Sequence, residues 1–287
     1  MLEAIQVMIG MGKILLPEPL ISSMIAASIL SEQKARKVIT GKEICLLAWQ
    51  EEAGSLPNAM IPKTRFENGR LSGVKRFVSD ASVAQSFLVT TDKGIALVPF
   101  ASSHVRIQSA LTQDGGNFGT IEFDHALSEL LPDVTEQNIN CALERATLLT
   151  AAYLHGMLVQ SFEITLDYLK TRRQFNAPIA SFQAIQHRMA DLKIQVMLSE
   201  ACIHRAAQEL DSQASIEDIQ RTVSRAKTRS SEAALLIGRQ SIQLHGAIGY
   251  TDECDIGLYL RKVMTYMNMF GSAEAYRHRF QQLYADF

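Results

Sequence analysis

The sequence has few cysteines, and none of them is arranged for a cluster. Its 287 residues include only four, Cys45, Cys141, Cys202 and Cys254, which are widely scattered. There is no CxxC pair and no spacing typical of metal ligands. We therefore expect reduced, mostly buried thiols in a cytoplasmic protein, with neither a disulfide framework nor a metal site.

The chain also lacks a charge excess and a long apolar run. The net charge is −2, which argues against nucleic acid as a partner because counterion release requires a basic face. The N-terminal stretch "MLEAIQVMIGMGKILLPEPL" is apolar, but it has no cationic segment, and Lys13 and Glu18 interrupt it. Neither a signal peptide nor a membrane span is expected.

Three segments with different residue patterns follow one another along the chain, which has no internal repeat and no low-complexity tract. Residues 1–43 have helical patterns over 2–15 and 21–39, which predict a thin N-terminal helical domain. Residues 44–132 have a strand texture and residues 133–287 return to a helical one. The predicted fold class is a multidomain α+β protein.

The middle segment carries three turn signals between short apolar runs. Asn68-Gly69 is typical of a type I′ hairpin turn, because both central residues of that turn need positive φ. Similar signals occur around 92–94 and 115–116. Several short strands joined by such turns predict a compact β-barrel or sandwich.

The C-terminal segment shows long apolar stripes at helical spacing. One runs from Leu148 to Leu169 and another from Phe182 to Val196. A third helix is predicted to start at Ser215, with Asp218 in the position of a capping box. A fourth helical region runs from about 258 to the C-terminus, with Gly271 as its expected break. Long helices joined by short loops predict an antiparallel four-helix bundle.

Four ordered segments resemble the acyl-CoA dehydrogenase family. "YLKTRRQFNAPIASFQAIQHRMADL" (168–192) is similar to its R-x-QFG-x-PI-x-FQ run, and "IQLHGAIGYTDECDIGLYLRK" (242–262) to its QxxGGxGY signature. "LSGVKRFVSDASVAQSFLV" (71–89) resembles strands of the family's middle domain, and "GKILLPEPLISSMIAASIL" (12–30) a late part of its N-terminal helical domain. The resemblance covers essentially the whole chain, and it implies that residues 1–43 are a shortened form of that N-terminal domain.

The resemblance implies FAD as cofactor and assigns residues to it across a subunit boundary. Arg172 would meet the pyrophosphate, for which a planar guanidinium is suited, and Phe175 would pack near the cofactor. Gln183, Gln243 and Gly246 match further positions that approach the dinucleotide. Taken without the resemblance, Arg172 reads as a surface arginine and Phe175 as a core aromatic.

Some positions depart from the family pattern. Asn176 replaces a glycine but tolerates left-handed φ, so that turn should survive, whereas Ala247 adds a methyl where the family has a second glycine. The loop that binds flavin and acyl-CoA in relatives appears only as "AWQEEAGSL" (48–56). Ser55 matches its final serine and is the candidate substrate-binding residue, but Trp49 and Gln50 stand where a threonine and a glutamate are commoner.

The catalytic base of the family has no clear counterpart. Phe270 occupies the usual glutamate position, and the alternative position on the first bundle helix aligns with Ala146. Glu144 is the candidate base in this chain, although its pairing with Arg145 is also typical of a solvated surface charge. Glu163 follows the core position Phe162, so we expect it at the boundary between the core and the surface and not in catalysis. His155, His187 and His245 are interpreted as structural histidines.

The shortened helical domain, the eroded loop and the missing base together favour one subunit of a heteromeric, α2β2-type acyl-CoA dehydrogenase. In this family such enzymes are associated with steroid side chains and other bulky acyl-CoA esters. The resemblance therefore implies α,β-dehydrogenation of an acyl-CoA, with electrons passed to an electron-transfer flavoprotein. The partner subunit would supply the base. Three alternatives stay open: a self-sufficient homo-oligomeric dehydrogenase that uses Glu144, a non-catalytic scaffold subunit without flavin, and a relative with other flavin chemistry such as a monooxygenase.

Overall fold

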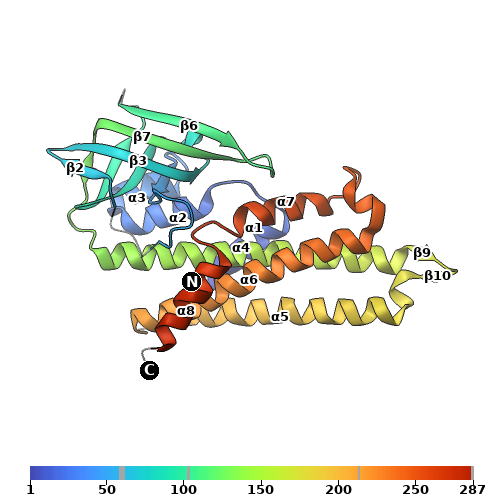
Figure 1. Ribbon diagram of the computed structural model, residues 1–287. Coiled ribbons are helices and arrows are strands. Elements are labelled where there is room, and N and C mark those ends of the chain that lie inside the picture. The colour runs from blue at the N-terminus through green and yellow to red at the C-terminus, as the bar shows by residue number, and fades with distance from the viewer. Residues whose placement is uncertain (58–61, 102–103, 213, 286–287) are drawn as a thin grey trace. The chain divides into compact units, whose positions relative to one another are not determined.

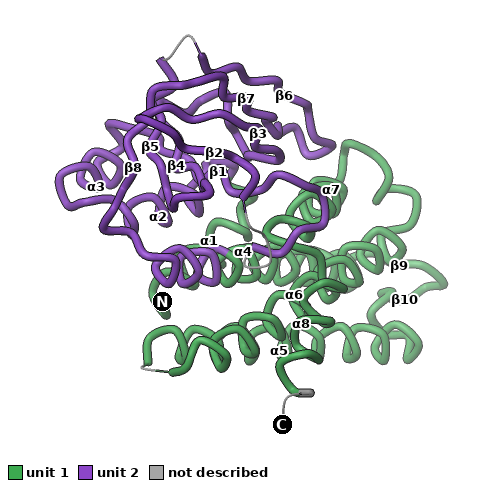
Figure 2. Tube along the Cα trace, turned by 60° about the vertical axis from the view of Figure 1, so that its left-hand side comes forward, with its two compact units in different colours: residues 1–16, 147–287 green, residues 17–146 purple. Residues whose placement is uncertain are grey.

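The computed structural model describes residues 1–57, 62–101, 104–212 and 214–285 (Figure 1). The chain divides into two compact units, residues 17–146 and residues 1–16 with 147–287 (Figure 2). The predicted three-part division at residues 43 and 132 stays a prediction. The general expectation of a mixed α+β fold with a helical C-terminal half is confirmed.

The unit of residues 17–146 begins with two helices where the sequence predicted one. Helix α2 covers Leu20–Ile29 and α3 covers Glu32–Ile39. Leu30 and Ser31 between them are extended, with ψ values of 151° and 153°. Serine commonly occupies the residue before a helix, and the chain uses Ser31 to start α3 rather than to continue α2.

Two open four-stranded sheets follow. One has the order β1-β4-β5-β8, with β1 (Cys45–Ala48), β4 (Ser86–Thr91), β5 (Gly94–Pro99) and β8 (Glu129–Leu130). The other has the order β2-β3-β7-β6, with β2 (Arg65–Glu67), β3 (Arg70–Ser79), β7 (Asn117–Leu127) and β6 (Val105–Leu111), and the short 3₁₀ turn η1 (Ala81–Val83) follows β3.

The two sheets share one apolar core and do not close into a barrel. Leu46 and Phe87 of the first sheet and Leu71 and Ile121 of the second belong to the same buried cluster. Of the two predicted alternatives, the described strands therefore form the sandwich, because neither sheet joins its own edges.

The predicted turn signals lie at hairpins. Asn68 and Gly69 join β2 to β3 with φ values of 48° and 74°, as a type I′ turn requires. Residues 92–93 join β4 to β5 between the paired residues Thr91 and Gly94. Gly115, at φ 82°, lies in the loop between β6 and β7.

The described residues of the helical half form three long helices and two short ones, α4 (Glu136–Thr171), α5 (Gln183–Asp211), α6 (Ile216–His245), α7 (Ile256–Tyr266) and α8 (Ala273–Ala285). The predicted stripes are mostly buried, and the Asp218 N–H donates to the capping Ser215 Oγ at 3.1 Å. Positive φ at Phe270 and Gly271 separates α7 from α8, where the break was expected. None of the described helices combines the length and the hydropathy that a bilayer span requires.

Helix α1 (Leu2–Lys13) belongs to the bundle unit, whereas α2 and α3 belong to the other unit. A Cβ added to Gly12 would lie 2.1 Å from the Tyr153 carbonyl oxygen, and one added to Gly156 would lie 2.1 Å from the Ile9 carbonyl oxygen. The two glycines thus allow the backbones of α1 and α4 to touch. Any larger residue at either position would force these helices apart.

A buried polar chain links the three long helices. His155 Nδ1 on α4 lies 3.1 Å from Ser199 Oγ on α5, which lies 3.0 Å from Ser230 Oγ on α6. Burial lowers the pKa of His155 to about 4, so its imidazole is neutral at neutral pH. His155 is thus a core residue, as expected, and its polar contacts fix the alignment of the helices.

Candidate functional site

The first family-like run forms a tight hairpin between α4 and α5. Strands β9 (Arg173–Gln174) and β10 (Ala177–Pro178) pair across a two-residue turn. Its central residues, Phe175 and Asn176, have φ values of 52° and 61°. The prediction that Asn176 keeps the left-handed turn is confirmed. Phenylalanine is unusual in this conformation, and it projects from a strained position.

The side chains of this hairpin face outward. Phe175 is 87% exposed and meets the edge of Phe182, also partly exposed, with ring centroids 6.2 Å apart. The interpretation of Phe175 as a core aromatic is therefore wrong. Arg172 is exposed, while its backbone N–H donates to the Tyr168 carbonyl and its carbonyl accepts from the Ile179 N–H. The backbone is fixed and the guanidinium is free to reach outward.

The second run ends α6 at the same end of the bundle (Figure 1). The rings of Tyr168 on α4 and His245 on α6 stack with centroids 4.4 Å apart, and the Tyr168 hydroxyl donates to the His245 carbonyl at 3.3 Å. Arg172 lies one helical turn after Tyr168, and Gln243 and Gly246 flank His245. The two motifs are thus brought together by a direct contact.

All five predicted cofactor-binding residues are exposed: Arg172, Phe175, Gln183, Gln243 and Gly246. Gly246 has a φ of 67°, and a Cβ there would meet nothing within 4 Å. A guanidinium, two side-chain amides and an open stretch of backbone fit a dinucleotide with a pyrophosphate. This end of the bundle presents such groups outward, and the described residues of its own unit do not enclose them.

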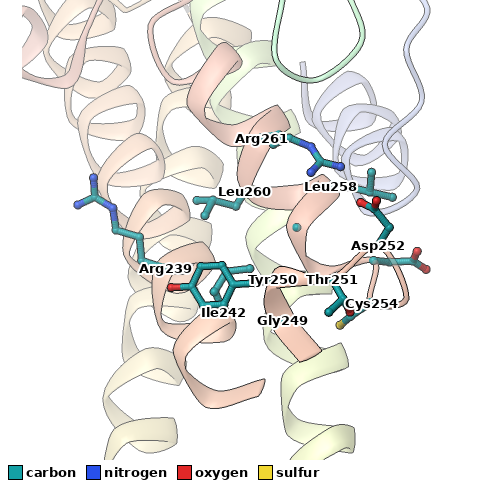
Figure 3. Close-up of a pocket in the computed structure, with 12 residues that line it drawn as sticks. Arg239, Ile242, Gly249, Tyr250, Thr251, Asp252, Cys254, Leu258, Leu260 and Arg261 are labelled. Carbon is teal, nitrogen blue, oxygen red and sulfur yellow. The ribbon is translucent and has the colours of Figure 1, made fainter. Parts of the chain in front are cut away.

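A cavity of about 450 Å³ lies between α6 and α7 and is lined almost entirely by residues of the second run (Figure 3). Its lining includes the five-residue 3₁₀ turn η3 (Gly246–Tyr250) only through Gly249 and Tyr250, and it does not include Gln243. The side chains of Arg239 and Arg261 extend in opposite directions in Figure 3. The cavity is thus not the predicted cofactor surface, and its cations do not converge on one ligand group.

Phe270 is built into the core of the bundle unit. Its ring is 6% exposed, and the Tyr276 hydroxyl donates to its carbonyl at 2.6 Å. Tyr276 in turn lies 3.0 Å from Thr147 Oγ1 on α4. The same turn is held from α6, where Lys227 Nζ donates to the Met267 carbonyl at 2.7 Å. Phe270, which the sequence predicts to stand at the family's base position, is therefore a buried and firmly anchored aromatic residue.

The structure corrects one interpretation of the candidate base. Glu144 is 1% exposed, so it is not a solvated surface charge. It lies on a stretch of α4 that is buried on several sides, because Leu143 and Ala146 next to it are buried as well. Glu163 is half-exposed and forms an ion pair with Lys13 at 3.7 Å, as expected of a boundary residue.

Glu51 of the loop 48–56 forms a buried ion pair with Lys75 on β3, which the sequence analysis missed. Lys75 Nζ donates to Glu51 Oε1 at 2.6 Å, and the two side chains are 0% and 6% exposed. Glu51 also accepts from Thr64 Oγ1 and from the N–H of Lys63. Lys75 lies in the "GVKRF" run of a predicted strand. A lysine buried in a strand needs an acidic partner, and this requirement could have indicated Glu51. Ser55 is half-buried, and its hydroxyl donates within the loop to the Glu52 carbonyl at 2.9 Å.

The environment of this pair alters both pKa values. Burial raises the pKa of Glu51, but the hydrogen bonds from Lys75, Lys63 and Thr64 outweigh it, and the net pKa is lowered. Burial lowers the pKa of Lys75 to about 8, with Glu51 opposing the change. Lys75 Nζ and Thr90 Oγ1 also donate to the Trp49 carbonyl, at 3.4 and 3.2 Å. The pair therefore fixes the backbone at Trp49.

Residues 137–282, just over half of the chain, match the family model described as "Acyl-CoA dehydrogenase, C-terminal domain". Among curated proteins, the acyl-CoA dehydrogenase FadE28 of Mycobacterium tuberculosis is 30% identical over 172 residues, which are 58% of this chain and 49% of that protein. FadE27 of the same organism is 27% identical over 278 residues, covering 90% of this chain and 74% of the relative. The chain thus spans about half the length of FadE28.

Solved structures share the fold. The "Tcur3481-Tcur3483 steroid ACAD G363A variant" superposes with a TM-score of 0.89 at 24% identity, over 99% of this chain and 80% of that one. The ChsE4-ChsE5 complex from M. tuberculosis gives a TM-score of 0.89 at 23% identity, over 100% of this chain and 81% of that one. Both the sandwich unit and the bundle unit are covered by these alignments. The family match over more than half of the sequence establishes that the chain belongs to the acyl-CoA dehydrogenase family.

Proposed function

We propose that the chain is one subunit of a heteromeric, FAD-dependent acyl-CoA dehydrogenase of the α2β2 type. The reaction is α,β-dehydrogenation of an acyl-CoA, with a steroid side chain as the acyl group and an electron-transfer flavoprotein as electron acceptor. Relatives whose names refer to a steroid ACAD and to a two-protein complex support this assignment. The observation that carries it is the pairing of an outward-facing cofactor surface with a buried Phe270 at the base position.

The chain's own residues would bind and orient the cofactor. When bound, FAD accepts the hydride that leaves the β-carbon. Arg172 would neutralise the pyrophosphate through a charge-assisted fork, and Gln183 and Gln243 would hydrogen-bond the nucleotide part. Phe175 would cover an apolar face of the cofactor, and Gly246 would leave room for its approach. The half-buried Ser55 is the candidate contact to the acyl-CoA.

Removal of the α-proton would then be the partner's task. Neither Phe270 nor Ala146 carries a proton acceptor, and Glu144 is buried, at 1% exposed. The rival assignment, a self-sufficient enzyme that uses Glu144, would require this buried side chain to reach the substrate. A scaffold without flavin would have no need of Arg172 and Gln243, which match cofactor-binding positions of the family and are exposed.

We expect the chain expressed alone to be colourless or poorly soluble, and to retain yellow flavin only when co-expressed with its partner. The physical reason is that its cofactor residues are exposed and cover one side of a dinucleotide only. Absorbance at flavin wavelengths after gel filtration measures the result. A soluble homo-oligomer with stoichiometric FAD would contradict the heteromer and favour the self-sufficient enzyme.

We expect Arg172→Ala to weaken FAD retention in the assembled complex by about 1.5–3 kcal/mol, which is roughly tenfold or more. The change removes a charge-assisted contact to phosphate. Arg205→Ala is the matched control, because Arg205 is an exposed arginine on α5 roughly 30 Å from Gln183 along the helix. Flavin release is measured by equilibrium dialysis, and equal affinities of the two variants would show that Arg172 is only a surface residue.

A further inference from the structure

The cofactor surface that we assign includes the C-terminal end of helix α6, where an anion is not expected. The last carbonyl groups of a helix lack N–H partners within it, and they carry the negative end of the helix dipole. Phosphates are therefore bound more readily at helix N-termini. Gln243 and Gly246 nevertheless lie on either side of His245, the last residue of α6. A pyrophosphate is tolerated at this end if donors engage its carbonyls.

Three carbonyls near this end are engaged by donors from the same stretch of chain. The Gly246 N–H donates to the carbonyls of Ile242 and Gln243. The Nδ1 atom of His245 lies 2.8 Å from the Ser241 carbonyl oxygen, and it is the donor because a carbonyl can only accept. The carbonyl of His245 itself, at the last residue of α6, accepts from a donor on another helix.

That donor is the hydroxyl of Tyr168 on α4, which lies 3.3 Å from the His245 carbonyl oxygen. The tyrosine ring stacks on the His245 imidazole, with centroids 4.4 Å apart and planes 22° apart, and this contact fixes where the hydroxyl lies. The imidazole is held in turn by the Ser241 carbonyl and is only 5% exposed. Tyr168 thus caps α6 from a neighbouring helix through a contact with little freedom.

The same tyrosine is linked to the arginine of the cofactor surface. Tyr168 and Arg172 are four residues apart, and the Arg172 N–H donates to the Tyr168 carbonyl at 2.8 Å. Side chains at this spacing lie on one face of a helix. Tyr168 therefore connects Arg172 to the helix end that carries Gln243 and Gly246. One side chain thus fixes the two parts of the cofactor surface relative to each other.

We propose that Tyr168 is a positioning residue for the cofactor. Its hydroxyl reduces the negative charge that the end of α6 presents to the pyrophosphate, and its ring holds that end beside Arg172. The assignment rests on the proposed function, because FAD is the ligand assigned to this surface. Tyr168 need not touch FAD, since its effect passes through the His245 carbonyl and the Arg172 side chain.

The test is the FAD affinity of the assembled complex with Tyr168→Phe, measured by equilibrium dialysis. The phenyl ring keeps the stacking on His245, whereas the hydrogen bond to the His245 carbonyl is lost. We expect FAD to bind about threefold to tenfold more weakly, which is the usual range for the loss of one such hydrogen bond. The measured quantity is binding, so it depends neither on turnover nor on the partner's base.

Tyr153→Phe is the matched control. The Tyr153 hydroxyl donates to the Leu16 carbonyl at 2.9 Å, so this change also removes one hydroxyl-to-carbonyl bond. Tyr153 is 1% exposed and precedes Tyr168 on α4 by roughly 22 Å along the helix. Because its side chain is more deeply buried, Tyr153→Phe should lower the midpoint of thermal unfolding at least as much as Tyr168→Phe does. It should leave FAD affinity unchanged.

A double-mutant cycle with Arg172→Ala separates positioning of the cofactor residues from a general loosening of the bundle. If Tyr168 acts on the pyrophosphate contact, Tyr168→Phe should reduce FAD affinity by a smaller factor in the Arg172→Ala background than in the wild type. Additive losses, unchanged FAD affinity of Tyr168→Phe, or an equal loss in Tyr153→Phe would overturn the inference. A wild-type complex that binds no FAD would overturn the proposed function together with it, so the two failures are distinguishable.

Discussion

Glu144→Gln is expected to leave dehydrogenation by the assembled complex within a few-fold of the wild type. Changing the partner's base glutamate to glutamine should instead lower the rate by about 10²–10⁴, which is the usual contribution of a general base. The structural reason is that Glu144 is 1% exposed, while the predicted base position holds the anchored Phe270. The measurement is acyl-CoA-dependent dye reduction at matched flavin content.

The converse substitution provides a control for this assignment. Phe270→Glu should not create an efficient second site, because positioning of the substrate supplies much of the rate. In addition, the new carboxylate would replace a ring that is 6% exposed, and burial of the charged form would raise its pKa and cost stability. Loss of activity in Glu144→Gln with FAD retained would show that Glu144 of this chain is the catalytic base, and would support the self-sufficient enzyme.

The second large effect concerns the ion pair inside the sandwich unit. We expect Lys75→Met to lower the free energy of unfolding by about 3–5 kcal/mol, because it leaves the Glu51 carboxylate buried without its ammonium partner. Lys75 is 0% exposed and donates to Glu51, Thr90 and the Trp49 carbonyl. Denaturant unfolding of the purified assembly, followed through Trp49 fluorescence, measures the loss.

A double variant separates the buried charge from lost packing. Glu51→Leu combined with Lys75→Met removes both charges and should be clearly more stable than Lys75→Met alone. Glu51 has a lowered pKa, so its ionised form stabilises the fold above its ordinary value of 4.5, and this contribution is lost as the pH falls through the lowered value. The stability difference between the wild type and Lys75→Met should therefore shrink on acidification. Equal stability of the single and double variants would contradict the buried-charge explanation.

The sequence by itself determined the features that depend on neighbouring residues. Asn68-Gly69 specified a type I′ turn, Asn176 allowed the left-handed turn of the β9–β10 hairpin, and Ser215 capped α6. The period of the apolar residues predicted the long helices. The family motifs could be recognised in the sequence because each is a short, contiguous run. These features need no contact between distant parts of the chain.

The tertiary structure alone decided which side chains are buried and what they meet. Glu144 looked like a surface charge next to Arg145, and only the packing around α4 enclosed it. Phe175 is a large apolar residue of the kind usually found in a core, but its place in a two-residue turn exposes its side chain. Glu51 and Lys75 are 24 residues apart and pair only because the β1 loop and β3 meet in the sandwich. Burial and pairing depend on contacts between such distant segments, and these contacts cannot be predicted from local sequence patterns.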